Sequence, residues 1–389
     1  MFSLNHHQPS RIIFGNNAIN EVIAITQTYG NNVFIVCGEN FPRRNESNLL
    51  FSLLDKSKVH YEIFNEVMTN PTESVIQSGA NILRNEKYSV IISVGGGSVH
   101  DAAKAIKLKG IHSVDSLIDY TVTGKYSVPG ITNNMIPHIT IPTISGTGAE
   151  ISPAALVRIE NQKHIIFSPF LYPTACIIDT DLLTCNDKNI LSKVGIDTFY
   201  QGFECFIASN SNPFSDMFAV STIINCMKYL PMLVEDAKNT DTKQLMALAS
   251  INSIKGVSNA GVGAIHALSD PLSGQFNIHH GVAETIVARN IINYYIERKV
   301  DKINQLEKII YQTFVSSNKD FPTSFIKQFD WFISKLKINT SDDIKLMNEM
   351  GFDITNLVLE SHNPDMATAP INMSDSDIAS IFKRSLWSI

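Results

Sequence analysis

The first half of the chain alternates short apolar runs, rich in β-branched residues, with longer segments of helical spacing. Four such runs stand out, over 32–37, 89–94, 138–141 and 175–178. Each is apolar on both faces, which is typical of parallel strands that are covered on both sides. The turn at 70–72 precedes a predicted helix over 73–85. Alternating strands and helices of this kind predict a doubly wound α/β domain with a Rossmann-like parallel sheet.

The second half shows helical spacing and offers few candidate strands. Helices are predicted over 214–234, 242–259, 300–316 and 374–385, the last with a serine cap. The change of pattern predicts two domains, an α/β domain over 1–187 and an all-helical domain over 188–389. We expect no membrane-spanning segment, because no apolar run approaches the length needed to span a bilayer.

Composition then limits the classes of function. The 389 residues are 44% hydrophobic and 17% charged, with a net charge of −6. This balance gives no electrostatic footprint for nucleic acid or anionic lipid. The N-terminus lacks a secretory signal, and the five scattered cysteines form no CxxC pair, which is typical of reduced thiols. We therefore expect a cytoplasmic protein that binds neither nucleic acid nor membranes.

A glycine-rich loop follows the second apolar run. Gly95, Gly96, Gly97 and Ser98 lie between a predicted strand and a predicted helix. Glycines let a ligand approach the backbone closely, and a helix N-terminus offers N–H groups to a phosphate. An ordinary turn would look the same, and the spacing is not that of the GxGxxG fingerprint. His100, just beyond, is expected near the surface of the helix cap or against a bound ligand.

A second loop, Pro142–Glu150, follows the third run with the sequence PTISGTGAE. Its hydroxyl groups and glycines can contact a phosphate or a ribose without adding charge, although a Ser/Thr-rich turn has the same composition. The two loops together favour nucleotide binding more than either loop does alone.

GGGSVHDAAKAI over 95–106 and PTISGTGAE resemble the paired signatures of the iron-dependent (group III) alcohol dehydrogenases, within the dehydroquinate-synthase-like superfamily. The resemblance implies a dinucleotide-binding N-terminal domain, a helical C-terminal domain, and a cleft between them for metal and substrate. It also implies a set of cofactor-binding residues. These are Gly96, Gly97, Ser98 and Asp101 at the pyrophosphate, Thr143, Ser145 and Thr147 at the nicotinamide half, Lys163 and Leu182 at ribose and ring, and Asn70.

The choice between NAD and NADP stays open at this point. By the resemblance, members that prefer NAD often carry an Asp just after the first strand, where it accepts a hydrogen bond from the adenosine ribose. Here that position is Gly38, followed by Glu39. The missing acid at 38 relieves repulsion of a 2′-phosphate, whereas Glu39 can restore it, so we expect either cofactor.

Candidate metal ligands lie in the helical half. Asp197 and Gln201, like His266 and Asp270, are four residues apart, so each pair lies on one helix face. His280 follows beyond a Pro-Leu-Ser-Gly segment over 271–274, which is expected to turn the chain back. The resemblance implies a ligand pattern of an Asp, a His four residues later, a His in the next motif and a His 14 residues beyond that.

Two positions depart from that pattern. Position 201 is Gln where the family has His, and position 270 is Asp where the family has a further His near the substrate. A Gln carbonyl is a weak ligand for Fe²⁺ or Zn²⁺. Asp270 could ligate, relay protons or orient His266. Three outcomes are open: a divalent metal on Asp197, His266 and His280 with Gln201 loosely ligating or replaced by water, a shifted site that recruits Asp270 or His279, or no metal.

We expect an NAD(P)-dependent alcohol dehydrogenase or aldehyde reductase for a small polar substrate. A divalent metal, Fe²⁺ or Zn²⁺, would act as a Lewis acid, and Asp270 and His280 are the candidate catalytic residues. A homodimer is expected from the resemblance alone. The alternatives are a lyase or cyclase of the dehydroquinate-synthase type that uses NAD transiently, and a non-catalytic nucleotide-binding protein.

Overall fold

The computed structural model describes residues 7–112, 116–122, 124, 135–160 and 162–387. Contacts between Cα atoms divide the chain into two compact units. One unit is Gln8–Cys185, and the other is Asn186–Ile389 together with the first residues through His7. The division along the chain falls close to the expected boundary at 187.

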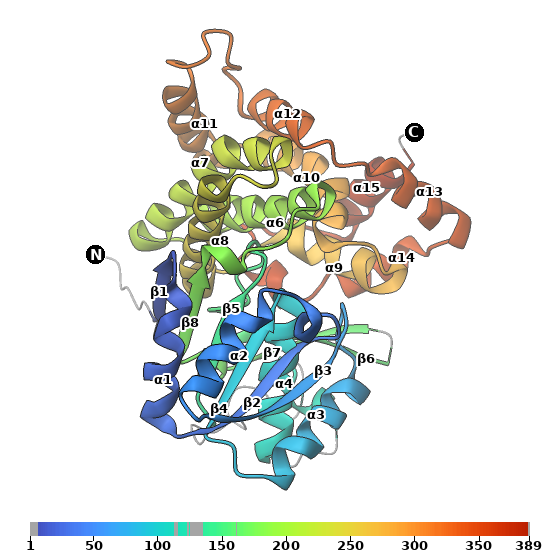
Figure 1. The fold of residues 1–389 in the computed structure, drawn as a ribbon. Coiled ribbons are helices and arrows are strands. Elements are labelled where there is room, and N and C mark those ends of the chain that lie inside the picture. Colours follow the sequence, from blue (N-terminus) through green and yellow to red (C-terminus); the bar gives the residue numbers. More distant parts are fainter. Residues whose placement is uncertain (1–6, 113–115, 123, 125–134, 161, 388–389) are drawn as a thin grey trace. The chain divides into compact units, whose positions relative to one another are not determined.

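The N-terminal unit is built on a six-stranded sheet whose paired strands all run parallel (Figure 1). The strands are β1 (Arg11–Gly15), β2 (Asn32–Gly38), β3 (His60–Val67), β4 (Val90–Gly95), β5 (His138–Pro142) and β8 (Ala175–Asp179). Their order is β1-β8-β5-β4-β2-β3. The four apolar runs form the four central strands, which confirms the predicted parallel α/β fold.

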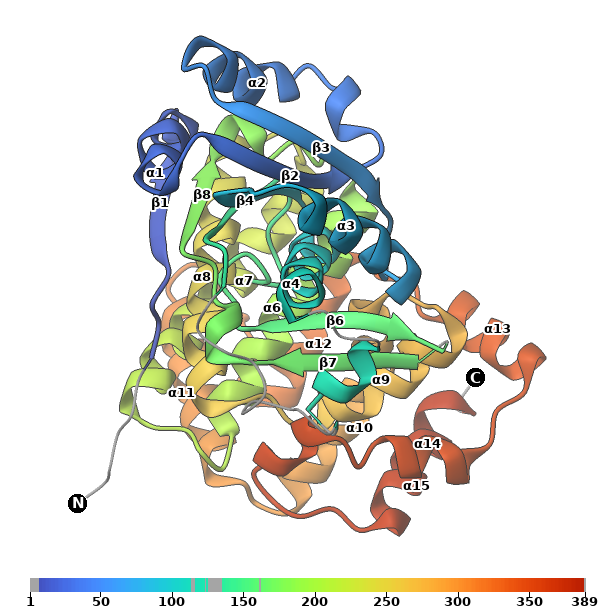
Figure 2. The same cartoon turned by 90° about the horizontal axis from the view of Figure 1, so that it is seen from below.

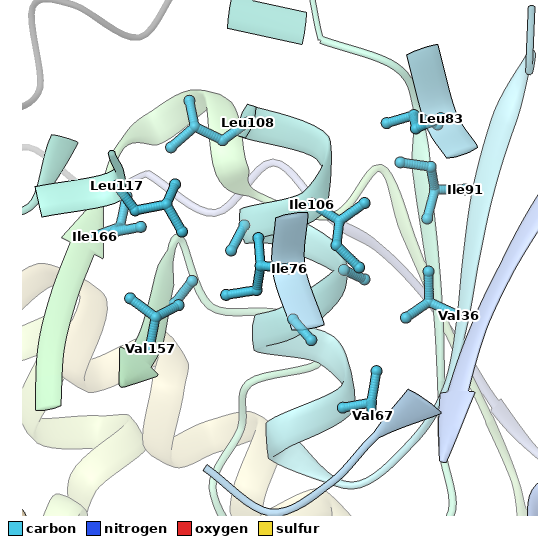
Figure 3. Packing of buried hydrophobic residues seen from close by; sticks show 14 of the residues in the cluster. Val36, Val67, Ile76, Leu83, Ile91, Ile106, Leu108, Leu117, Val157 and Ile166 are labelled. Atoms are coloured by element: carbon cyan, nitrogen blue, oxygen red, sulfur yellow. The ribbon is translucent and has the colours of Figure 1, made fainter. Parts of the chain in front are cut away.

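Helices cover both faces of this sheet. On one face, α1 (Glu21–Tyr29) and α2 (Ser47–Lys56) share an apolar core with the central strands. On the other face lie α3 (Glu73–Asn85) and α4 (Gly97–His112), whose core residues are shown in Figure 3. An antiparallel hairpin of β6 (Ala154–Ile159) and β7 (Gln162–Phe167) covers the far side of α4 (Figure 2). Helix α4 is therefore buried on nearly every side.

The order of the strands reverses between β2 and β4. After β2 the chain passes to β3 on one side, whereas after β4 it passes to β5 on the other side. In open parallel sheets, ligands bind outside the carboxyl ends of the strands at such a switch point. Gly38 is the last residue of β2, and the glycine-rich loop begins with Gly95 at the end of β4, so the topology places both candidate nucleotide segments at this position.

In the C-terminal unit, all assigned elements among the described residues are helical. The α-helices are α6 (Lys188–Ile207), α7 (Pro213–Glu235), α8 (Thr240–Ala260), α9 (Ala264–Phe276), α10 (His280–Glu297), α11 (Asp301–Phe314), α12 (Phe325–Leu336), α13 (Ser341–Met350), α14 (Ile354–Glu360) and α15 (Asp375–Leu386). Helix α6 packs against α7, α8, α9 and α10. Ser374 caps α15 with a capping box, as its sequence predicts.

Helix α7 corrects one expectation about apolar length. Among the described helices it is the one that is long and apolar enough to cross a membrane, with a mean hydropathy of 1.4 over its most apolar 18 residues. In the structure, 44% of that window is buried, and the helix packs against α6 and α8. A core helix of a helical domain passes the same test, so its length and composition are weak support for a membrane span.

Candidate active site

The two loops predicted from the sequence lie against each other in the N-terminal unit. They leave neighbouring strands, where Gly95 at the end of β4 is in register with Pro142 at the end of β5. The carbonyl of Gly95 accepts a hydrogen bond from the amide of Thr143 at 2.9 Å. A Cβ atom at Gly97 would lie only 2.7 Å from Thr147 Oγ1, so the close approach requires glycine there.

Helix α4 begins at Gly97, directly after the glycine-rich loop, so its positive end faces the place where a phosphate is expected. The backbone amide of Asn70, in the left-handed conformation with φ of 55°, lies 3.4 Å from Ser98 Oγ. Ser145 Oγ is buried and has no hydrogen-bond partner in the described part of the chain. These three segments form one polar surface without a cluster of basic side chains.

Lys104 on α4, the helix that follows the glycine-rich loop, connects that helix to the second loop by hydrogen bonds. Its fully buried Nζ donates to the carbonyls of Ala149 and Ala154, at 2.8 and 2.6 Å, and lies 3.4 Å from Asp101 Oδ1. Burial lowers the pKa of Lys104 and raises that of Asp101, while the positive charge of each neighbouring lysine, Lys104 and Lys163, opposes the rise at Asp101. Asp101 is therefore linked to the second loop through Lys104, and its role at the pyrophosphate stays a prediction.

The remaining predicted cofactor residues lie on other elements of the N-terminal unit. Gly38 ends β2, and Glu39 after it is exposed. Leu182 is buried in a short 3-10 turn, Thr180–Leu182, that follows β8. Lys163 lies on β7 of the hairpin rather than at the carboxyl end of a sheet strand. Its positive charge opposes the rise that burial causes in the pKa of Asp101.

His100 does not lie at the surface, which corrects the expectation for it. The side chain is completely buried, and Nδ1 lies 2.8 Å from Ser93 Oγ on β4. Ser93 Oγ also lies 2.8 Å from His138 Nε2 on β5. Burial, with a further contribution from the charge of Lys104, lowers the pKa of His100 to about 3. His100 is thus a neutral core residue because α4 packs on the sheet along this side.

In the C-terminal unit, three helices bring four potential ligands together. These are Asp197 on α6, His266 on α9, and His280 and Glu284 on α10. One ligand atom from each residue lies within 4.8 Å of all the others. His266 Nε2 is 3.2 Å from Glu284 Oε1 and 3.6 Å from Asp197 Oδ1. His280 Nε2 is 3.6 Å from Glu284 Oε1, so the predicted trio meets at one point.

Glu204, one turn along α6 from position 201, sets the orientation of His266. Its Oε2 accepts a hydrogen bond from His266 Nδ1 at 2.6 Å, and Oε1 accepts one from the amide of Ile265 at 2.6 Å. This arrangement turns His266 Nε2 toward Asp197 and Glu284. Glu204 therefore has the orienting role that was one of the three open to Asp270.

Gln201 uses both ends of its amide in hydrogen bonds. Nε2 donates to Asp197 Oδ1 at 2.9 Å, and Oε1 accepts from Ser253 Oγ. Since a carboxylate only accepts hydrogen bonds, the nitrogen must be the end that faces Asp197. Asp270, at 3.8 Å between Oδ1 and His280 Nδ1, lies on the opposite side of the second histidine.

The chain turns back between α9 and α10 later than the sequence suggested. Pro271 and the residues after it continue α9 to Phe276, and Asn277, with φ of 53° in the left-handed region, ends the helix. His279 then caps α10, with its Nδ1 accepting from the amide of Gly281. A Cβ at Gly281 would lie 2.0 Å from the carbonyl oxygen of Lys193, so glycine lets the first turn of α10, with His280, approach α6.

The electrostatics of this centre fit a cation. Asp197, Glu204 and Glu284 are all buried carboxylates, and neither oxygen of Glu284 accepts a hydrogen bond from any described residue. Burial raises the pKa of Glu284 well above its usual value, and the charge of Asp197 raises it further. For His266, burial lowers the pKa, but Glu284 and the two other carboxylates raise it well above its usual value. Such buried groups fit a divalent metal ion, which would offset their negative charge.

Glu284 is the member of this group that reasoning from the sequence missed. It lies four residues after His280, the same spacing that identified Asp197 with Gln201 and His266 with Asp270. The signal was therefore present, but the family pattern ends at the last histidine and directs attention away from it.

Comparison with known proteins agrees with this geometry. The family model for iron-containing alcohol dehydrogenase matches residues 9–180, and the model for the C-terminal part of the same family matches 192–386. The chain belongs to the iron-containing alcohol dehydrogenase family. Members of this family are oxidoreductases that act on CH–OH groups, which confirms the resemblance and the expected class of enzyme.

Individual relatives share about a quarter of their residues with the chain. The long-chain-alcohol dehydrogenase 1 of Geobacillus thermodenitrificans is 26% identical over 334 residues, covering 82% of this chain and 81% of the relative. The 1,3-propanediol dehydrogenase of Klebsiella pneumoniae is 25% identical, covering 78% of each. A solved structure of sulfoacetaldehyde reductase from Bifidobacterium kashiwanohense with NAD⁺ superposes with a TM-score of 0.84, at 22% identity, over the whole of both chains. It shows the shared fold.

Proposed function

We propose that the chain is an NAD(H)-dependent alcohol dehydrogenase or aldehyde reductase that uses a divalent metal and acts on a small polar substrate. The observation that carries this proposal is the buried group of Asp197, His266 and His280, beside the buried carboxylate of Glu284, which accepts no hydrogen bond from any described residue. Buried carboxylates without a cation are costly, so we expect a site that no longer binds metal to have lost them. The polar surface at the sheet's switch point supplies the matching support for a dinucleotide.

The bound cation would lower the pKa of a substrate hydroxyl, and the nicotinamide would take up or return the hydride. The protein contributes orientation and proton handling. Asp197, His266 and His280 would hold the cation, with Glu204 fixing the ring of His266. Asp270, partly exposed and 3.8 Å from His280 Nδ1, would pass the hydroxyl proton toward solvent. The glycine loop and the start of α4 would hold the pyrophosphate through backbone N–H groups.

For the cofactor, we propose a preference for NAD(H). Glu39 directly follows the end of β2 at the switch point and is exposed. An acidic side chain at this position accepts a hydrogen bond from the ribose 2′-hydroxyl and repels a 2′-phosphate. Comparing NADH and NADPH as cosubstrates tests the preference, and Glu39→Gln should narrow the difference between them. Equal use of both cofactors by the unmodified enzyme would contradict it.

The function is tested by following NADH absorbance with a panel of small alcohols and aldehydes. Activity should disappear after chelation and return when Fe²⁺ or Zn²⁺ is added back to the same protein. Full activity in protein shown by elemental analysis to be free of metal would overturn the metal-assisted mechanism. Tight binding of NADH without turnover of any alcohol or aldehyde would instead favour the non-catalytic nucleotide-binding protein.

A further inference from the structure

We propose that Glu284 is the fourth protein ligand of the metal. It replaces the ligand at position 201, which is His in the family pattern and Gln in this chain. The proposal rests on the proposed function, because it assumes that a divalent cation occupies the centre. It goes further by assigning a ligand set of two carboxylates and two imidazoles, from Asp197, Glu284, His266 and His280. Gln201 then acts on the metal only through Asp197.

The position of Glu284 is the first argument. Its Oε1 lies 3.2 Å from His266 Nε2 and 3.6 Å from His280 Nε2, so it faces both imidazoles at once. Ligand atoms about 2.0–2.2 Å from a tetrahedral zinc ion are about 3.3–3.6 Å from one another. The three separations of 3.2, 3.6 and 3.6 Å, the last between His266 Nε2 and Asp197 Oδ1, are close to the edges of such a tetrahedron.

The burial of Glu284 is the second argument. The side chain is completely shielded from solvent, and neither carboxylate oxygen accepts a hydrogen bond from a described residue. A buried carboxylate without hydrogen bonds is costly, and such groups in native proteins are paired or bind metals. The imidazoles of His266 and His280 lie beside it with their Nε2 atoms facing the same point, so a cation bound there by the neutral rings would satisfy all three side chains.

The engagement of Gln201 is the third argument. Its amide nitrogen faces Asp197 and its carbonyl oxygen is bonded by Ser253, so coordination would require the side chain to turn around and break both hydrogen bonds. As it stands, Gln201 donates to Asp197 Oδ1, and such outer contacts orient a ligating carboxylate. The change from His to Gln at 201 and the presence of Glu at 284 thus form one exchange of ligands between α6 and α10.

The exchange is tested by metal binding, not by activity. Full-length protein is stripped with a chelator and titrated with Co²⁺, whose visible absorption reports its ligands, and Zn²⁺ affinity is measured by competition with a chromophoric chelator. Glu284→Gln, which keeps the shape of the side chain, should weaken Zn²⁺ binding by more than about 100-fold and change the Co²⁺ spectrum. Gln201→Ala should weaken binding less, within the roughly 10–100-fold range of outer contacts.

The double variant Gln201→His with Glu284→Gln provides the decisive control. It restores a third imidazole from α6, so Zn²⁺ affinity should recover most of what Glu284→Gln alone loses. If Glu284→Gln binds Zn²⁺ and Co²⁺ like the unmodified protein, the assignment of Glu284 is wrong while the metal-assisted function stands. If the unmodified protein binds neither ion, both fail. If Glu284→Gln does not fold, Gln201→Ala decides, because a loss larger than about 100-fold there would make Gln201 the ligand.

Discussion

Glu204 Oε2 on α6 and His266 Nδ1 on α9 lie 2.6 Å apart, in a contact that is buried from solvent. When one ring nitrogen of an imidazole binds a metal, a carboxylate that accepts a hydrogen bond from the other nitrogen fixes the tautomer and the orientation of the ring. It also makes the metal-binding nitrogen more basic and so a stronger ligand. The same carboxylate also accepts from the amide of Ile265 in the first turn of α9. The side chain of Glu204 thus stabilises the first turn of α9 and also orients His266, the candidate ligand on that helix.

The first prediction concerns this pair. Glu204→Ala should weaken Zn²⁺ binding by about 10–100-fold, because His266 loses the partner that orients it. Glu204→Gln can still accept from Nδ1, so its loss should be smaller. Competition with a chromophoric chelator measures both, and Glu297→Ala, which removes an exposed carboxylate on α10, is the control. Unchanged affinity in Glu204→Ala would mean that His266 does not depend on this contact.

The second prediction concerns the contact between the two nucleotide loops. Gly97→Ala places a methyl group about 2.7 Å from Thr147 Oγ1, so one of the loops must move. We expect an unfolding free energy lower by about 1–3 kcal/mol and weaker binding of NADH. Thr147→Ala removes the opposing atoms, so the double variant should be more stable than Gly97→Ala alone. Chemical denaturation and NADH fluorescence measure the two effects, and strict additivity of the two changes would contradict the clash.

The third prediction concerns Lys104. Lys104→Met removes the donor to the carbonyls of Ala149 and Ala154 and leaves Asp101 without its buried positive partner. Breaking a buried charge pair costs about 3–5 kcal/mol, so we expect a loss of unfolding free energy of that order. Lys87→Met, at an exposed position of the same unit, is the matched control. Equal stability of the two variants in urea denaturation would show that Lys104 is not the link between the loops.

The central strands could be predicted from the sequence because they are covered on both faces and therefore read as continuous apolar runs. The edge strands β1 and β3 could not, since most of their side chains are exposed or only partly buried, the apolar run of β1 is three residues long, and that of β3 is broken by polar residues. Hairpin β6–β7 was missed because it covers α4 rather than joining the sheet. Burial of His100 follows from that same packing, which no local pattern records.

The trio of Asp197, His266 and His280 could be identified by spacing and family resemblance. The partners of these residues could not, because they depend on how the helices face one another. Whether Gln201 presents its nitrogen or its oxygen is decided by Asp197 and Ser253 together, and the second residue is 52 positions away in the chain. Glu284 becomes a candidate ligand only when α10 has been placed beside α6 and α9.

The last prediction concerns acid stability and the buried pair of His100 and His138. Burial lowers the pKa of both histidines, that of His100 to about 3, so both stay neutral in the folded protein. In the unfolded chain a histidine takes up its proton near pH 6.5. Between about pH 3 and pH 6.5 the unfolded state therefore binds more protons at these two histidines, and their contribution lowers the free energy of unfolding as the pH is lowered through this range.

Each such histidine contributes a slope of up to about 1.4 kcal/mol per pH unit. His100→Gln, whose amide can still bond to Ser93, should remove one of these contributions and make the stability between pH 4 and 6 less dependent on pH. Urea denaturation at several pH values measures the slope, and His60→Gln, which removes an exposed imidazole, is the matched control. An unchanged slope in His100→Gln would mean that this ring takes up its proton in the folded state as readily as in the unfolded one. That result would contradict the expectation from its complete burial beside Ser93.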